Sequence, residues 1–248
     1  MKASAPGVRP ASAGAPDRRL IEDLVAANRI LFAQGVVDGF GHVSVRHDQD
    51  PQRFLLSRSL APALVTAADI IEFDLDGNAV DAGGRAVYLE IFIHGAIYKA
   101  RPDVQAVVHS HSPSVIPFGV AGALLRPVYH MSSFLGSGAP IFDIRKQAGM
   151  TDMLIRNNSL GADLARALGD SSVVLMRGHG STAVGNSLQQ AVFRAIYTEI
   201  NARLQAEAAR LGNVTFLDPE EASLATETNN RVISRPWELW KRSLGEIE

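Results

Sequence analysis

Apolar and polar positions follow a helical period near the start of the chain and a shorter period after it. Apolar residues recur every three or four positions between Asp17, a candidate N-cap, and Gly35, a candidate helix stop. Short apolar runs then follow at 43–45, 54–56 and 70–73, and turn-forming residues separate them. This part of the chain therefore predicts one helix followed by strands of one sheet.

The later part of the chain interleaves helices with strands. The pattern predicts a helix over 90–100, and the apolar run 105–109 predicts a buried strand after it. A second helix, over 159–168, leads into a core strand over 173–176. A long amphipathic helix over 187–211 is expected to cover one face of the sheet. The alternation predicts an α/β fold.

The two ends of the chain differ from its body. Residues 1–16 are rich in Ala, Pro, Gly and Ser and have no apolar period, so we expect a mobile tail outside the fold. No repeat or linker divides residues 17–248, which predicts a single domain. Trp237 and Trp240 lie three apart on a candidate helix. We expect them to dock on the body or on a neighbouring subunit, because exposing two indole rings is costly.

Composition narrows the classes of partner. The chain has 248 residues, 46% hydrophobic and 20% charged, which predicts a globular protein with a sizeable core. Its net charge of −2 disfavours nucleic acid and anionic membranes as partners. The most apolar stretch, 104–125, is interrupted by histidines and prolines, so we expect no membrane span. The first residues lack the apolar core of a signal peptide, so we expect a cytoplasmic location. The absence of cysteine excludes thiolate metal sites and a Cys nucleophile.

The most informative chemistry lies in the histidines. His109 and His111 stand two apart at the end of a predicted strand, so their side chains project from one face. His179 lies between two glycines, just beyond the strand 173–176. If the two strands lie close in one sheet, three imidazoles meet, and Glu90 could add an oxygen ligand or a catalytic carboxylate.

Three nitrogens and a carboxylate suit Mn²⁺ or Zn²⁺ acting as a Lewis acid. A divalent metal is therefore the predicted cofactor. Taken alone, a His-x-His pair is as often accidental, and a lone glutamate in a first helical turn is usually solvated. His94 lies on the same helix face as Glu90, and we expect it to pack behind the site rather than to be a ligand.

Several spaced motifs together resemble the class II aldolase and adducin family. In family order, they are Gly41-His42-Val43-Ser44, Glu90-x-x-x-His94, the run from Arg101 to Pro113, and Arg177-Gly178-His179-Gly180. The resemblance implies a three-layer α/β/α fold with a central, largely antiparallel sheet. It also implies a homo-oligomer, a tetramer or a dimer of tetramers, with sites between subunits. It places the metal on His109, His111 and His179, with Glu90 as a ligand or a proton carrier.

Departures from the family's sugar-phosphate aldolases bear on the substrate. Those enzymes grip phosphate with serines before the glutamate and with a Thr-Pro-Ser/Thr-Gly turn. Here Tyr88-Leu89 and Ser57-Arg58-Ser59-Leu60 stand in those places, so a phosphate pocket is not expected. Arg58 offers a planar fork for a carboxylate, although a strand-end surface cation is the alternative. Tyr88 offers an apolar surface for an aromatic ring, and the resemblance adds Ser44 and Ser57 as substrate contacts.

Two histidines replace family residues near the expected reaction centre. His42 stands where the aldolases have Asn, and it adds a group able to titrate near neutral pH. His130 stands where an aldolase tyrosine supplies a proton across the subunit interface; a structural interface histidine is the alternative. With Glu90, these two residues are the catalytic candidates.

The segments 57–62 and 129–136 resemble the decarboxylase branch of the family, which acts on ortho-hydroxylated aromatic dicarboxylates. The expected substrate is a small aromatic carboxylate, 3-hydroxy-2-methylpyridine-4,5-dicarboxylate of vitamin B6 degradation, with 3,4-dihydroxyphthalate as the alternative. A metal-dependent aldolase or epimerase of a non-phosphorylated hydroxy-keto acid is a second possible activity. A non-catalytic module like the adducin head is a third, and the retained metal ligands argue against it.

Overall fold

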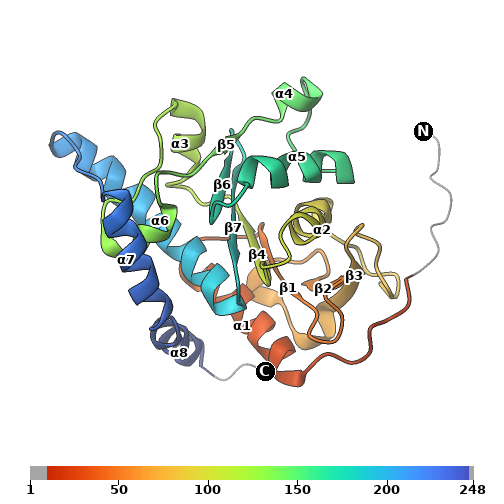
Figure 1. Cartoon of the computed structure of the whole chain (residues 1–248). Coiled ribbons are helices and arrows are strands. Elements are labelled where there is room, and N and C mark those ends of the chain that lie inside the picture. The colour runs from red at the N-terminus through yellow and green to blue at the C-terminus, as the bar shows by residue number, and fades with distance from the viewer. Residues whose placement is uncertain (1–9, 246–248) are drawn as a thin grey trace.

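A seven-stranded sheet forms the centre of the computed structural model, which describes residues 10–245 (Figure 1). The strand order is β3-β2-β1-β4-β7-β6-β5, and every neighbouring pair is antiparallel apart from β5 and β6. The strands are β1 (His42–Arg46), β2 (Arg53–Ser57), β3 (Ile70–Asp74), β4 (Ala106–Ser110), β5 (Ile141–Phe142), β6 (Val173–Met176) and β7 (Gly180–Gly185). The predicted largely antiparallel sheet is confirmed.

Helices cover both faces of this sheet. They are α1 (Arg18–Ala33), α2 (Ile91–Ala100), α3 (Ile116–Ala121), α4 (Arg145–Ala148), α5 (Asn158–Leu168), α6 (Leu188–Leu211), α7 (Pro219–Asn230) and α8 (Ser234–Ser243). One hydrophobic cluster joins the sheet to α1, α6 and α8, and a second joins its other face to α2 and α5. The three-layer α/β/α arrangement is therefore confirmed. No described helix combines the length and the apolarity needed to cross a bilayer.

Local signals account for most of the predicted elements. The side chain of Asp17 accepts a hydrogen bond from the backbone of Arg19 and caps α1. Asn157 and Ser187 cap α5 and α6 in the same way. Buried Trp237 and Trp240 join α8 to the body of the chain, which is one of the two positions expected for them.

The chain also forms elements that the apolar pattern does not reveal. Strand β7 has the sequence GSTAVG, whose glycines and hydroxyl residues do not make an apolar run. Helix α7 has few apolar residues, although Asp218 and Glu221 form a capping box at its start. Tertiary packing therefore places β7, whereas α7 begins at a local capping signal that is not accompanied by an apolar period.

The predicted tail over 1–16 lies partly outside the described residues, because the structure describes the chain only from Pro10. Within the described part, Ser12 and the backbone N–H of Ala13 donate hydrogen bonds to the carboxylate of Glu72 on β3. Arg53 on β2 donates to the carbonyl of Ala11. These contacts place residues 11–13 beside the β2–β3 edge of the sheet.

Candidate metal centre

The end of strand β4 places two of the candidate metal ligands, His109 and His111, on one side of the sheet. Val107 packs in the cluster beneath α2, whereas Ala106 and Val108 pack in the cluster beneath α1 and α6. His109 and His111 continue the alternation of Val107, so both rings lie on the α2 side. The same-face prediction for this pair is confirmed by the ring-to-ring distance of 5.2 Å between their centroids.

The turn between β6 and β7 brings in the third histidine. Gly178 adopts φ = 67°, the left-handed region that favours glycine, and this bends the chain at His179. A Cβ atom on Gly180 would lie 2.1 Å from the carbonyl oxygen of Ser110, so only glycine allows β7 to begin against β4. As a result, Nε2 of His179 lies 3.1 Å from Nε2 of His111.

Gly180→Ala is expected to lower the free energy of unfolding by about 3 kcal/mol, because the added methyl group meets backbone atoms rather than a movable side chain. Denaturant unfolding measures this difference. The matched control is Gly39→Ala, whose Cβ would meet nothing within 4 Å, and we expect a change within about 0.5 kcal/mol. Equal stability of the two variants would show that β7 can move away from β4 without cost.

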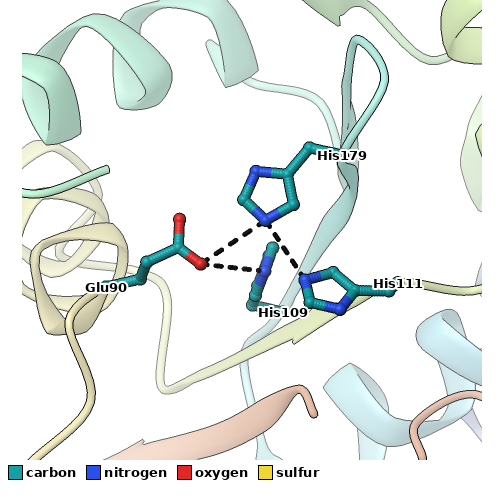
Figure 2. A group of neighbouring side chains, drawn as sticks. All are labelled: Glu90, His109, His111 and His179. Atoms are coloured by element: carbon teal, nitrogen blue, oxygen red, sulfur yellow. Dashed lines mark hydrogen bonds and ion pairs between the residues drawn. The ribbon is translucent and has the colours of Figure 1, made fainter. Parts of the chain in front are cut away.

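Glu90 completes the cluster from the start of α2, where it is the N-cap residue (Figure 2). Its Oε2 lies 3.6 Å from Nε2 of His109 and 3.4 Å from Nε2 of His179. Its Oε1 accepts a hydrogen bond of 2.9 Å from the backbone N–H of Ile155. One ligand atom from each of Glu90, His109, His111 and His179 lies within 4.8 Å of all the others.

Outer contacts orient the imidazoles of this cluster. Nδ1 of His179 lies 3.1 Å from the carbonyl oxygen of Met153, so Nδ1–H donates there and the lone pair of Nε2 faces the cluster. Met153 itself adopts φ = 67°, a conformation rare for a residue with a side chain. Nε2 of His109 is buried without a hydrogen-bond partner among the described residues. A buried ring nitrogen left open in this way is expected of a metal ligand.

These residues fit a divalent ion. Atoms bound about 2.1 Å from one ion lie roughly 2.9–3.4 Å apart in octahedral or tetrahedral arrangements. The measured separations of 3.1, 3.4 and 3.6 Å are close to that range. Three imidazole nitrogens and a carboxylate oxygen suit Mn²⁺ and Zn²⁺.

Burial and charge also favour the protonation states that a metal requires. Burial lowers the pKa of His109 to about 3 and lowers the pKa of His111 as well. Burial alone would raise the pKa of Glu90, but His179 and His109 hold it at about 2. His179 differs, because Glu90 raises its pKa against the effect of burial. Among the three imidazoles, His179 is thus the one whose pKa the carboxylate of Glu90 raises above its usual value.

A cavity of about 640 Å³ opens over the cluster. The residues that line it are Gly39, Phe40, Gly41, His42, Ser59, Leu60, Ala61, Tyr88, Leu89, Glu90, His109, His111 and Leu154. Apolar side chains make up much of this wall, and Glu90, His109 and His111 supply charged and polar groups. Phe40 and Leu154 carry no signal in the sequence, because only the fold brings their separate segments to the cavity beside Leu60 of the 57–62 segment.

The predicted substrate contacts divide into two groups. Tyr88 lines the cavity, where its ring centroid lies 4.5 Å from that of His42 and its hydroxyl donates to the carbonyl of Leu60. Ser44 and Ser57 have no exposed surface and do not lie on the cavity wall. The structure therefore brings only Tyr88 of these three to the cavity.

Arg58 lies next to the cavity residue Ser59 but is not itself part of the wall. Its Nε donates a hydrogen bond of 2.6 Å to Asp69, whose carboxylate also belongs to the capping box of the short helix 67–69. The ion pair fixes the base of the guanidinium group, and 37% of the side chain stays exposed.

The two catalytic histidine candidates lie in different places. His42 lines the cavity, and its ring centroid is 5.0 Å from that of His109. His130 is exposed at the start of the short helical segment His130–Leu135, where its carbonyl accepts from Asn229. His130 does not line the cavity of its own chain, so its expected contribution across a subunit interface stays a prediction.

Comparisons with known proteins agree with this geometry. Residues 22–206 match the model of the Class II Aldolase and Adducin N-terminal domain. The chain is 40% identical over 248 residues to the decarboxylase tropJ of Talaromyces stipitatus, and the alignment covers 90% of this chain and 93% of that protein. It is 34% identical over 206 residues to the 3,4-dihydroxyphthalate decarboxylase of Arthrobacter keyseri, covering 77% and 79% of the two chains.

Among solved structures, an aldolase II superfamily protein from Pseudomonas syringae superposes with a TM-score of 0.77 and 26% identity. The superposition covers 93% of this chain and 94% of the other. The sequence match extends through the sheet and the metal cluster, and the structural match covers nearly the whole molecule. The chain therefore belongs to the class II aldolase and adducin family.

Proposed function

We propose that this protein is a divalent-metal-dependent decarboxylase, a carbon–carbon lyase, of an ortho-hydroxylated aromatic dicarboxylate. The observation that carries the proposal is the cluster of Glu90 and three histidines beside a largely apolar cavity. Tyr88 and Leu89 line this cavity at the position where the sugar-phosphate aldolases of the family carry serines. Relatives named as decarboxylases support a lyase of this kind.

The proposed substrate has either of two rings. Relatives named 3,4-dihydroxyphthalate decarboxylase, 33–34% identical to this chain, favour a benzene dicarboxylate. The pyridine compound 3-hydroxy-2-methylpyridine-4,5-dicarboxylate has the same pattern of a ring hydroxyl beside a carboxylate. Both present a flat ring that suits the wall formed by Phe40, Leu60 and Tyr88.

The chemistry separates into binding, protonation and bond cleavage. A divalent ion held by Glu90, His109, His111 and His179 would supply a Lewis acid for the ring hydroxyl and the adjacent carboxylate. The hydroxyl gives up its proton, and the ring carbon that bears the carboxylate takes a proton from Glu90 through water, or from His130 of an adjacent subunit, which leaves a ketone at the neighbouring oxygen. When the carbon–carboxylate bond then breaks, CO₂ departs and the electron pair of that bond passes through the ring to this oxygen, which restores the aromatic ring.

Arg58 is the proposed anchor for the second carboxylate. Because Asp69 accepts from its Nε, the guanidinium group has a fixed base beside the cavity residue Ser59. A planar guanidinium can donate two parallel hydrogen bonds to a carboxylate, whereas the ammonium group of lysine cannot match that geometry.

Arg58→Lys is expected to raise KM about tenfold while kcat changes less than about twofold, because the charge remains but the fork is lost. Steady-state kinetics on the substrate identified below measure both constants. Arg85→Lys is the control: Arg85 donates to the backbone carbonyls of Ala68, Asp81 and Ala82, away from the cavity wall. An unchanged KM in Arg58→Lys would remove Arg58 from substrate binding.

A homo-oligomer with sites between subunits belongs to the same proposal. The exposed side chain of His130 is available to a neighbouring chain, as a proton donor across an interface requires. Mn²⁺ is the proposed ion, and Zn²⁺ is the alternative that the same ligands accept.

The test is CO₂ release by the purified protein reconstituted with Mn²⁺. The panel contains the hydroxymethylpyridine dicarboxylate, 3,4-dihydroxyphthalate and a non-phosphorylated hydroxy-keto acid. Metal-dependent CO₂ from one aromatic acid would support the decarboxylase and identify its ring. An aldehyde product without CO₂ would instead indicate an aldolase, and a protein that binds no metal and turns over nothing would indicate a non-catalytic module.

A further inference from the structure

A hydrogen-bonded series of four buried side chains runs from the cavity into the layer between the sheet and α2. Nδ1 of His42 lies 2.7 Å from Nε2 of His94, and Nδ1 of His94 lies 2.6 Å from Oγ of Ser44. Oγ of Ser44 lies 2.8 Å from the hydroxyl of Tyr98. All four residues are at most 4% exposed, and only His42 lines the cavity.

Both rings are neutral, because each is at most 4% exposed and their hydrogen-bonded nitrogens contact only each other and Oγ of Ser44, with no carboxylate among the described partners. Burial lowers the pKa of His94 to about 3, and it lowers the pKa of His42 well below its usual value. A neutral imidazole carries one N–H, so each ring donates from one nitrogen and accepts at the other. The hydrogen bonds of the series can therefore all point toward the cavity or all point away from it.

The hydroxyl of Tyr98 decides between these two directions. Among the described residues, Oγ of Ser44 is the only acceptor within hydrogen-bond distance of this hydroxyl. If Ser44 donated to Tyr98, the phenolic O–H would be buried without an acceptor, which costs about 1–3 kcal/mol. Tyr98 therefore donates to Ser44, and the single proton of Ser44 goes to Nδ1 of His94.

The remaining protons follow from this assignment. Because Nδ1 of His94 accepts from Ser44, the proton of His94 lies on Nε2 and is donated to Nδ1 of His42. The proton of His42 must then lie on Nε2. No hydrogen-bond partner within the described part of the chain takes this atom, and the ring that carries it lines the cavity.

We propose that Ser44, acting through His94, holds His42 in the Nε2–H form, so that His42 donates a hydrogen bond to a substrate oxygen in the cavity. The identity of that oxygen, a carboxylate or ring hydroxyl oxygen, rests on the proposed function. Ser44 and His94 are positioning residues, and His42 acts as a neutral hydrogen-bond donor rather than a proton carrier. Ser44 was expected to contact substrate but is fully buried, and a positioning role behind His42 explains that burial.

The side chain of His42 is well placed for such a contact. Its ring packs between Tyr88 and His109, with centroid distances of 4.5 and 5.0 Å. Tyr88 belongs to the apolar wall of the cavity, and His109 is one of the candidate metal ligands. A donor held between them, with its orientation fixed before the ligand arrives, is worth more than a mobile one because it needs no reorganisation.

The tautomer of His42 can be measured by NMR on ¹⁵N-histidine-labelled protein loaded with diamagnetic Zn²⁺. Long-range ¹H–¹⁵N correlations distinguish a protonated Nε2 from a protonated Nδ1, and the spectrum of His42→Gln assigns the signals. The expected result is protonated Nε2 and unprotonated Nδ1. Protonated Nδ1 in the native protein would overturn the proposal.

Two variants test whether Ser44 is the cause. In Ser44→Ala, Nδ1 of His94 has no partner in either direction, so the His42 signals are expected to move toward a mixture of the two tautomers. In Tyr98→Phe, Nδ1 of His94 is the one remaining described acceptor for the buried Ser44 hydroxyl, so Ser44 still donates there and the Nε2–H form is expected to persist. A Ser44→Ala spectrum identical to that of the native protein would contradict the inference.

Kinetics give a separate readout. Loss of the fixed donor in Ser44→Ala is expected to lower kcat/KM about tenfold at unchanged metal content. The NMR measurement does not depend on turnover, so failure of the protein to decarboxylate any compound would reject the proposed function and leave the tautomer result standing. The reverse outcome, active protein with protonated Nδ1 on His42, would reject only this inference.

Discussion

His109→Ala is expected to abolish metal binding and decarboxylation together, with activity falling at least roughly 10³-fold. His109 is 1% exposed, and its Nε2 faces Glu90 without a hydrogen-bond partner within the described chain. Removing it takes away the most deeply buried of the candidate ligands. Metal content per chain by elemental analysis and CO₂ release are the two measurements.

A matched control separates this effect from a general loss of stability. His47→Ala removes another buried histidine, which follows β1 at the opposite end from His42 and is not part of the cluster. We expect this variant to keep its metal even if its unfolding temperature falls. Full metal occupancy in His109→Ala would reject His109 as a ligand.

Glu90→Gln is expected to lower decarboxylation by at least roughly 10²-fold. Glutamine keeps the size of the side chain and can still accept the hydrogen bond from Ile155. The negative charge is lost, however, and with it the capacity to move a proton and to balance the charge of a bound ion. Because three imidazoles remain, we expect metal content near one ion per chain with weaker affinity.

The measurement combines single-turnover CO₂ release with metal titration of the variant. Glu72→Gln is the control, because Glu72 is a partly buried glutamate that pairs with Arg53 on the neighbouring strand, outside the cavity. Unchanged turnover in Glu90→Gln would exclude Glu90 from the chemistry. Complete loss of metal would assign it as an indispensable ligand rather than only a proton carrier.

The candidate metal centre was partly predictable because strand geometry is local. His109 and His111 follow an apolar run, and the two-residue alternation places both on one side of the sheet wherever that strand lies. The position of His179 was conditional, since it required the strands ending at His109 and Met176 to lie close together. In the structure these strands are not neighbours, because β7 lies between them and carries His179 to β4 through its first residue.

The cavity wall and the hydrogen-bonded series behind His42 were less predictable. Ser44 shares a strand face with His42, and their spacing alone would give both side chains the same surroundings. Helix α2 covers Ser44 with His94 and Tyr98, whereas His42 stands at the end of β1 and opens to the cavity. Whether a residue on this strand face can contact substrate therefore depends on whether α2 covers it, as it covers Ser44 but not His42.

By itself, the sequence determined the α/β architecture, the four metal-ligand candidates and the family. The architecture and the ligand candidates depend on residue type and on the short-range periods of helix and strand, and the family depends on the resemblance of several spaced motifs. Only the tertiary structure decided the insertion of β7 beside β4, the ion pair that holds Arg58, and the burial of Ser44 behind His42. These features depend on contacts between segments that are distant along the chain, and the packing of the sheet and its helices, rather than local spacing, sets such contacts.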